Sequence, residues 1–274
     1  MLKLLNRLFS ILLLTSLTAC TNVFLQPSNK LLITPDQLNI PYSDITFTSK
    51  DKLKLNGWWF PAQQNSKALV IFLHGNAENI STHSAGVHWL TKHQFDVFIF
   101  DYRGYGRSEG QADIDMSIND IYSAIDYAAN HYPAKNKIFL IGQSLGASMG
   151  IYALAQRPDD IDAAVFVSPF SDYRKISREM LATSWISWAF QWPLSFMVSN
   201  DYRPLDYASA LPDIPILYLY SHQDEVIKPE HVQTLYQHTH QPKFIEQLDD
   251  SHSRILSNEN NRNVLLKYLN TWLD

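Results

Sequence analysis

Cysteine is nearly absent from this sequence, because Cys20 is the only one among 274 residues. An intrachain disulfide is therefore excluded, and the fold has to be stabilised by a buried core, which a chain of this length can build. Runs of lysine and arginine are absent too, and the formal net charge is −5. An acidic chain without a basic run does not attract a phosphate backbone, so we expect no nucleic-acid partner. Internal repeats and low-complexity tracts are missing as well, and the 46% share of hydrophobic residues is typical of a globular protein.

The first twenty residues have the three parts of a secretory signal. Lys3 and Arg7 precede an apolar stretch over about residues 8–17, and small residues follow. This stretch is shorter than the ~20 residues that a membrane-spanning helix needs. Leu17-Thr18-Ala19-Cys20 also resembles a bacterial lipobox, in which the cysteine is lipidated and becomes the first mature residue. We therefore expect residues 1–19 to be a lipoprotein signal peptide and Cys20 to carry the lipid that holds the protein on a membrane.

Two alternatives to a lipoprotein remain for this N-terminus: an uncleaved anchor, and a plain signal peptide followed by a chance cysteine. Thr21 is not the aspartate that favours inner-membrane retention in lipoproteins of this type. The resemblance therefore implies the bacterial outer membrane, with the protein facing the periplasm. Removal of the leader lowers Lys+Arg from 22 to 20 against 27 acids, so the mature chain carries −7.

The rest of the chain alternates strand-like and helix-like segments. Residues 20–43 contain three prolines and predict a tether that settles onto the domain, and residues 44–274 form that domain. A β-hairpin is expected from residues 44–49 and 53–60. Short, almost unbroken apolar runs are typical of strands buried on both faces of a parallel sheet, and they occupy residues 68–73, 97–100, 138–141, 163–167 and 216–220. A last strand is expected at residues 244–248. Helices are expected between them, at residues 83–93, 117–131, 145–156 and 229–237 and at the C-terminus. This order predicts an α/β fold with a mostly parallel central sheet flanked by helices.

One segment, at about residues 172–207, breaks this alternation. It holds three of the seven tryptophans, Trp185, Trp188 and Trp192, together with Phe190 and Phe196. So many aromatic side chains predict burial against another surface. We expect a small helical cap that covers the active site, the alternative being that the aromatics only pack the excursion onto the sheet.

Gly142-Gln143-Ser144-Leu145-Gly146 follows a predicted strand and precedes a predicted helix. In a Gly-x-Ser-x-Gly turn of this kind the serine lies on a strained strand-to-helix corner, and the glycines allow close backbone contacts. The N-terminus of the following helix offers amide donors to an oxyanion. This motif predicts Ser144 to be a catalytic nucleophile.

A nucleophilic serine needs a base, and the base needs an acid that orients it. His252 follows the last predicted strand, and Asp224 follows the strand before it, which gives the chain order Ser, Asp, His. Asp172, Asp249 and Asp250 remain as alternative acids. His74 and His222 are expected to be structural, and His238-x-His240 lacks the further ligands of a metal site. We therefore predict a catalytic triad of Ser144, Asp224 and His252 and no metal or organic cofactor.

The ordered motifs resemble the α/β-hydrolase superfamily, in particular its branch related to BEM46 and to ABHD13- and ABHD17-type proteins. The resemblance covers about residues 44–270 and rests on the triad loops together with three further blocks, Leu55-Asn56-Gly57-Trp58-Trp59, Phe72-Leu73-His74-Gly75-Asn76-Ala77 and Phe100-Asp101-Tyr102-Arg103-Gly104-Tyr105-Gly106-Arg107-Ser108. It implies that the backbone amides of Asn76 and Leu145 form the oxyanion hole. It also implies that Asp101 and Arg103 are structural.

These residues predict a carboxylesterase-like serine hydrolase that transfers an acyl group from a small or lipid ester through Ser144 to water. A thioesterase, a protein or lipid deacylase and a serine peptidase remain as alternatives, since a fold does not fix the substrate. Outside the enzymes, a catalytically silent binding protein on the membrane is the remaining possibility. The complete set of Ser, Asp and His argues against that alternative.

Overall fold

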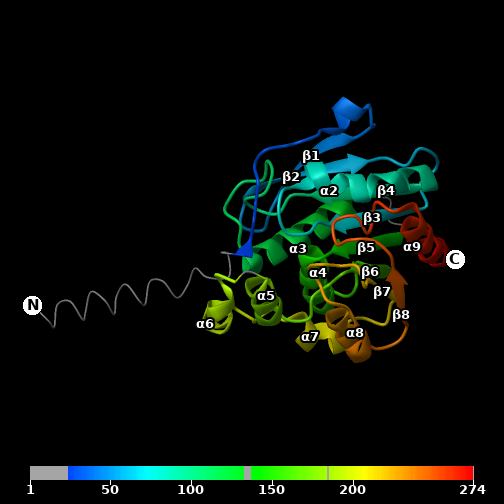
Figure 1. Cartoon of the computed structure of the whole chain (residues 1–274). Coiled ribbons are helices and arrows are strands. Elements are labelled where there is room, and N and C mark those ends of the chain that lie inside the picture. The colour runs from blue at the N-terminus through cyan, green and yellow to red at the C-terminus, as the bar shows by residue number, and fades with distance from the viewer. Residues whose placement is uncertain (1–23, 133–136, 184, 274) are drawn as a thin grey trace, which may run out of the picture.

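A single eight-stranded sheet runs through the computed structural model, which describes residues 24–132, 137–183 and 185–273 (Figure 1). The strand order is β1-β2-β4-β3-β5-β6-β7-β8. β1 pairs with β2, and β2 with β4, in the antiparallel sense, and every later pair is parallel. The strands are β1 (Ser43–Thr48), β2 (Lys54–Phe60), β3 (Ala68–Leu73), β4 (Phe95–Phe100), β5 (Lys137–Gln143), β6 (Ala163–Val167), β7 (Ile216–Ser221) and β8 (Lys243–Leu248). The predicted α/β-hydrolase fold is confirmed.

The unbroken apolar runs are explained by burial on both faces of the sheet. Every residue of β3 is buried, and its side chains alternate between two separate cores. Leu69, Ile71 and Leu73 belong to the core on one face, whereas Val70 and Phe72 belong to the core on the other. Since neither face meets water, no polar residue interrupts the run.

Helices cover both faces of this sheet (Figure 1). They are α3 (Ile114–His131), α4 (Leu145–Gln156), α8 (Pro229–His238) and α9 (Glu259–Thr271). α3 begins three residues earlier than expected, because the Asp113 side chain caps it by accepting a hydrogen bond from the Met116 N–H. The helix expected over residues 83–93 is wrong. The chain forms α2 (Ile80–His83) and two 3₁₀ turns, Ser84–Gly86 and His88–His93, and the break lies at Gly86, a residue that is costly inside a helix.

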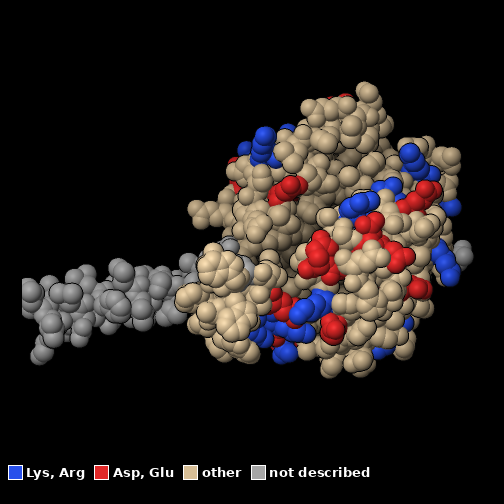
Figure 2. Space-filling view, in the orientation of Figure 1, with Lys and Arg blue, Asp and Glu red and all other residues tan. Residues whose placement is uncertain are grey.

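The excursion at about residues 172–207 forms three short helices, α5 (Tyr173–Ala182), α6 (Gln191–Phe196) and α7 (Pro204–Tyr207). The prediction that its aromatic side chains are buried is wrong for the tryptophans, because Trp185 is 88% exposed and Trp188 is 61% exposed. The inward side of this segment is instead formed by Tyr173 and Ile176 of α5 together with Ser195 and Val198, so the tryptophan rings point to solvent. Figure 2 shows the region as a projection with few charged side chains.

The described N-terminal residues, 24–42, lie against the domain. Ser28 donates its N–H to the Glu78 carbonyl (3.2 Å) and accepts a hydrogen bond from the Gly106 N–H (2.9 Å). Within the described ranges, no helix is long and apolar enough to cross a membrane. The expected signal peptide and Cys20 lie outside the described residues, so lipidation stays a prediction.

Candidate active site

Ser144 occupies a strained corner between β5 and α4. Its backbone has φ 54° and ψ −116°, and residues other than glycine rarely adopt a positive φ. The Ser144 N–H is held by the Val167 carbonyl at 2.9 Å. A Cβ at Gly146 would collide with the backbone carbonyl oxygens of Leu73 and His74, so only glycine permits α4 to approach β3 this closely. The Gly-x-Ser-x-Gly motif thus has the local geometry that its sequence predicts.

His252 and Asp224 form a close pair between the loops that follow β8 and β7. His252 Nδ1 lies 2.7 Å from Asp224 Oδ2, and the other carboxylate oxygen accepts the N–H groups of Val226 (2.9 Å) and Ile227 (2.8 Å). Burial alone would raise the pKa of the Asp224 carboxyl, but its hydrogen bond with His252 and its backbone donors hold that pKa below the usual value. An ionised Asp224 accepts a hydrogen bond from the Nδ1–H of His252, which leaves Nε2 without a proton and able to take one.

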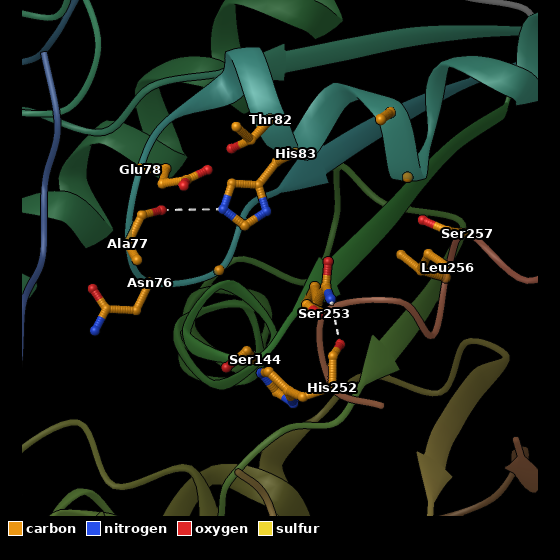
Figure 3. Close-up of a pocket in the computed structure, with 14 residues that line it drawn as sticks. Asn76, Ala77, Glu78, Thr82, His83, Ser144, His252, Ser253, Leu256 and Ser257 are labelled. Carbon is orange, nitrogen blue, oxygen red and sulfur yellow. Dashed lines mark hydrogen bonds between the residues drawn. The ribbon is translucent and has the colours of Figure 1, made fainter. Parts of the chain in front are cut away.

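The Ser144 and His252 side chains lie side by side in Figure 3, and both line the same two cavities. Two hydrogen bonds hold the His252 backbone in this position. Its carbonyl accepts from Gln143 Nε2 at 3.2 Å, and its N–H donates to the Glu225 carboxylate at 3.1 Å. The three residues of the predicted triad therefore come from three separate loops and meet at one edge of the sheet.

Two of the alternative acids, Asp172 and Asp250, have other partners. Asp172 caps α5 through the Lys175 N–H (2.7 Å) and lies 2.9 Å from the Arg203 guanidinium. Asp250 accepts from the Ser251 N–H, and Arg254 lies 3.6 Å away. The structure thus pairs His252 with Asp224 and not with these carboxylates. No group of three metal-binding side chains occurs within the described ranges.

Asn76 is fixed by the N-terminal residues that precede the sheet. Its side-chain amide donates to the Phe24 carbonyl at 2.6 Å, while its side-chain oxygen accepts from the Gln26 N–H and the Tyr105 hydroxyl, both at 3.0 Å. Figure 3 shows this side chain pointing away from Ser144. Only the backbone of Asn76 is then left for the reaction centre. Among the hydrogen bonds of the described residues, none uses the N–H of Asn76 or of Leu145 as a donor.

Two cavities meet at Ser144. One, of about 250 Å³, is mainly apolar and is lined by Leu145, Phe170, Ile176 and Met180 as well as by Phe24. The other, of about 310 Å³, is more polar and is lined among others by Glu78, Thr82, His83 and Ser257. A substrate whose reacting carbon lies at Ser144 can place one apolar and one polar part in these two spaces.

Two histidines near the site remain neutral. Burial lowers the pKa of His74, which is fully buried and whose Nδ1 lies 2.7 Å from the Gly75 carbonyl. Burial also lowers the pKa of His83, which contacts the Ala77 carbonyl at 3.2 Å (Figure 3). Neutral rings packed under the loop after β3 support its shape without adding charge.

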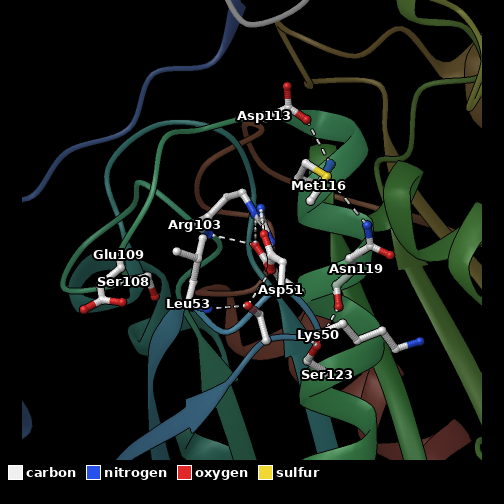
Figure 4. Close-up of polar contacts among 12 residues, drawn as sticks. Lys50, Asp51, Leu53, Arg103, Ser108, Glu109, Asp113, Met116, Asn119 and Ser123 are labelled. Atoms are coloured by element: carbon white, nitrogen blue, oxygen red, sulfur yellow. Dashed lines mark hydrogen bonds and ion pairs between the residues drawn. The ribbon is translucent and has the colours of Figure 1, made fainter.

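Arg103 anchors the loop after β4 and lies in a polar network outside both cavities (Figure 4). Its guanidinium contacts Asp120 at 2.6 Å and Asp51 at 2.8 Å, which ties the loop to α3 and to the turn between β1 and β2. Asp101 accepts the Ile80 N–H at 2.9 Å and thereby holds the start of α2. In these interactions Arg103 and Asp101 contact loop and helix residues and no member of the Ser144, Asp224 and His252 triad.

A buried contact between the excursion and the body has no local pattern in the sequence that predicts it. The Ser171 hydroxyl and His231 Nδ1 are 2.8 Å apart, and His231 Nε2 lies 3.0 Å from the Glu179 carboxylate. The Ser171 N–H also donates to Nδ1, so the Nε2–H is the proton that donates to Glu179. This cluster joins α5 to α8 and fixes the wall of the apolar cavity that α5 provides.

Comparisons with known proteins agree with this geometry. The model of the Hydrolase_4 family, described as serine aminopeptidase S33, matches residues 64–211. The uncharacterized protein YfhR of Salmonella typhi is 33% identical over 238 residues, which cover 81% of this chain and 77% of that protein. The protein bem46 of Schizosaccharomyces pombe is 25% identical over 224 residues, which cover 78% and 71% of the two chains. The structure of the esterase Pf2001 of Pyrococcus furiosus has a TM-score of 0.74 and 26% identity, with 92% of this chain and 98% of that chain covered.

Proposed function

Because the chain belongs to the Hydrolase_4 family of α/β hydrolases, we propose that it is a serine hydrolase that cleaves carboxylic esters through an acyl-enzyme on Ser144. The observation that carries the proposal is the His252–Asp224 pair at 2.7 Å, next to a serine on a strained strand-to-helix corner. The esterase Pf2001, which has the same fold, adds support for ester hydrolysis.

In the proposed reaction, Ser144 Oγ attacks the ester carbonyl while His252 Nε2 takes the hydroxyl proton. Asp224 holds the imidazole tautomer and stabilises the imidazolium. The N–H groups of Asn76 and Leu145 donate to the oxygen that becomes negative. His252 then gives its proton to the departing alcohol oxygen, and a water molecule activated by His252 releases the acyl group as a carboxylic acid.

The two cavities suggest how an ester is oriented. The apolar cavity suits the acyl chain, because Ile176, Met180 and Phe170 offer no hydrogen-bonding groups to it. The polar cavity suits an alcohol that bears hydroxyl or charged groups. We therefore favour an ester of a medium or long acyl chain with a polar alcohol.

A peptidase is the second candidate, because the matching family is described as serine aminopeptidase. Glu78 lines the polar cavity and is the carboxylate there that could pair with an amino group. Parallel assays on p-nitrophenyl esters of rising chain length and on aminoacyl p-nitroanilides separate the two activities. Hydrolysis of the esters alone supports the proposal, whereas hydrolysis confined to the anilides replaces it with the peptidase.

We also propose that Cys20 carries a lipid that attaches the protein to the outer membrane on its periplasmic side. The support is the lipobox-like sequence, since the cysteine itself lies outside the described residues. Cys20→Ser should move the protein from the membrane fraction to the soluble fraction without lowering its activity per molecule. A Cys20→Ser protein that stays in the membrane fraction would contradict lipid attachment.

A further inference from the structure

The large apolar side chains that the fold leaves in solvent are concentrated in one place. Nine of the thirteen exposed large hydrophobic residues in the described ranges lie within residues 180–197. We name as the aromatic surface the six of them that are more than half exposed, which are Trp185, Ile186, Trp188, Phe190, Trp192 and Phe196. A contiguous apolar surface of this kind marks a site that another molecule covers.

The composition of this segment indicates what covers it. Residues 180–200 contain no acidic or basic side chain. Arg178 lies at the edge, with its guanidinium 4.7 Å from the centre of the Trp192 ring. Tryptophan and phenylalanine flanked by a cation are typical of segments that lie in the headgroup region of a bilayer. Figure 2 shows charged side chains only beside this projection, on the flank toward the body.

The aromatic surface also lies next to the entrance of the apolar cavity. Met180, at the end of α5, is 39% exposed and lines that cavity. Phe24, the first described residue, lines it as well, and Figure 1 shows the start of the described chain beside α5 and α6. Four residues of extended chain reach at most about 14 Å, so a lipid on Cys20 would lie close to the same entrance.

We propose that the aromatic surface docks into a phospholipid bilayer and brings the entrance of the apolar cavity to the bilayer, where Ser144 receives acyl esters of membrane lipids. This inference rests on the proposed esterase and names its substrate class as lipid esters. The occupant of the surface is the bilayer, and not a second copy of this chain or the N-terminal residues 1–23.

The test uses the full chain reconstituted into vesicles of phosphatidylethanolamine and phosphatidylglycerol. Brominated phospholipids quench the emission of tryptophans that contact acyl chains. Trp185→Ser/Ile186→Ser/Phe190→Ser removes half of the surface and keeps Trp188 and Trp192 as reporters. The matched control is Leu32→Ser/Ile33→Ser/Leu38→Ser, which removes three apolar side chains that are 47–56% exposed on another part of the molecule.

We expect strong quenching in the wild type and in the control, and a roughly threefold or larger reduction in the surface variant, as expected when apolar contact area with the bilayer is lost. Hydrolysis of 4-methylumbelliferyl oleate held in the vesicles should fall in the surface variant alone. Hydrolysis of the water-soluble acetate should be equal in all three proteins.

If the wild type shows no quenching, the inference is overturned. The aromatic surface is then covered by a second copy of the chain or by its own N-terminal residues. Equal losses of quenching in the surface variant and in the control also overturn the inference. So does a surface variant whose quenching is reduced but whose rate on vesicle-held oleate is unchanged. Failure of the proposed function looks different, because neither ester would then be hydrolysed while the quenching pattern persisted.

Discussion

The side-chain amide of Asn76 donates a 2.6 Å hydrogen bond to the backbone carbonyl of Phe24, 52 residues earlier in the chain. The loop whose N–H we assign to the oxyanion hole is therefore held in place by the N-terminal segment. That segment also provides a wall of the apolar cavity. Residues 24–26 are thus part of the site's framework and not only a connection to it.

Asn76→Ala should lower kcat by about tenfold or more with little change in KM, because an oxyanion donor displaced by a fraction of an ångström loses its alignment in the transition state. Steady-state kinetics on a soluble ester measures this. Tyr105→Phe is the matched control, since it removes one of the three hydrogen bonds of the Asn76 side chain and keeps the ring. Its effect should be smaller. A kcat for Asn76→Ala equal to that of the wild type would show that the N-terminal segment does not position the loop.

Asp101 should make stability depend on pH. Burial raises the pKa of this carboxyl to about 7 from 3.8, so the folded state binds a proton that the unfolded state has released. Its contribution is fully present below about pH 4 and is lost as the pH rises through 7, on the order of a few kcal/mol in the free energy of unfolding. The depressed pKa values of His74 and His83 act in the opposite sense, with stability lost as the pH falls.

The comparison that isolates this carboxyl is urea unfolding of the wild type and of Asp101→Asn from pH 5 to 8. Asparagine keeps an oxygen that accepts the Ile80 N–H. The difference in unfolding free energy between the two proteins should therefore shift in favour of Asp101→Asn as the pH rises. A difference that does not change over this interval contradicts a raised pKa at Asp101.

Met180→Trp should narrow the acyl cavity at its entrance. The larger ring should reduce kcat/KM for long-chain esters by about tenfold relative to acetate, because a filled pocket excludes the added methylenes. Trp188→Ala is the control, since Trp188 is 61% exposed and does not line the cavity. On water-soluble esters its chain-length profile should match that of the wild type. A shifted profile in Trp188→Ala would assign selectivity to the aromatic surface instead of α5.

The sequence was sufficient for the fold and for placing Ser144 on a strand-to-helix corner, because both depend on local patterns with few alternatives. Apolar runs such as 68–73 are short and follow one another between helix-like segments, which favours strands buried on both faces. The turn at Ser144 requires glycine at 146, since backbone oxygens fill the space of a Cβ. Asp224 had competitors at 172, 249 and 250, and only the three-dimensional arrangement of the loops separates them.

Other features depend on contacts between distant segments and have no local pattern. The hydrogen bonds of Asn76 join residues about 50 positions apart. The cluster of Ser171, His231 and Glu179 likewise spans 60 positions. The exposure of Trp185 could not be derived either, because hydrophobicity predicts burial for every tryptophan and does not say which one the body leaves uncovered.

The measurement that tests the central claim most directly is ester hydrolysis by Ser144→Ala, His252→Ala and the double variant. Each single change should lower kcat by about 10⁴-fold or more, and the double variant should lose little beyond that, because nucleophile and base act as one unit. Circular dichroism should show all three folded, since the strand-to-helix corner depends on its glycines and not on the Ser144 hydroxyl. Losses that multiply in the double variant, or a Ser144→Ala protein that keeps activity within about tenfold of the wild type, would contradict catalysis by this Ser–His pair.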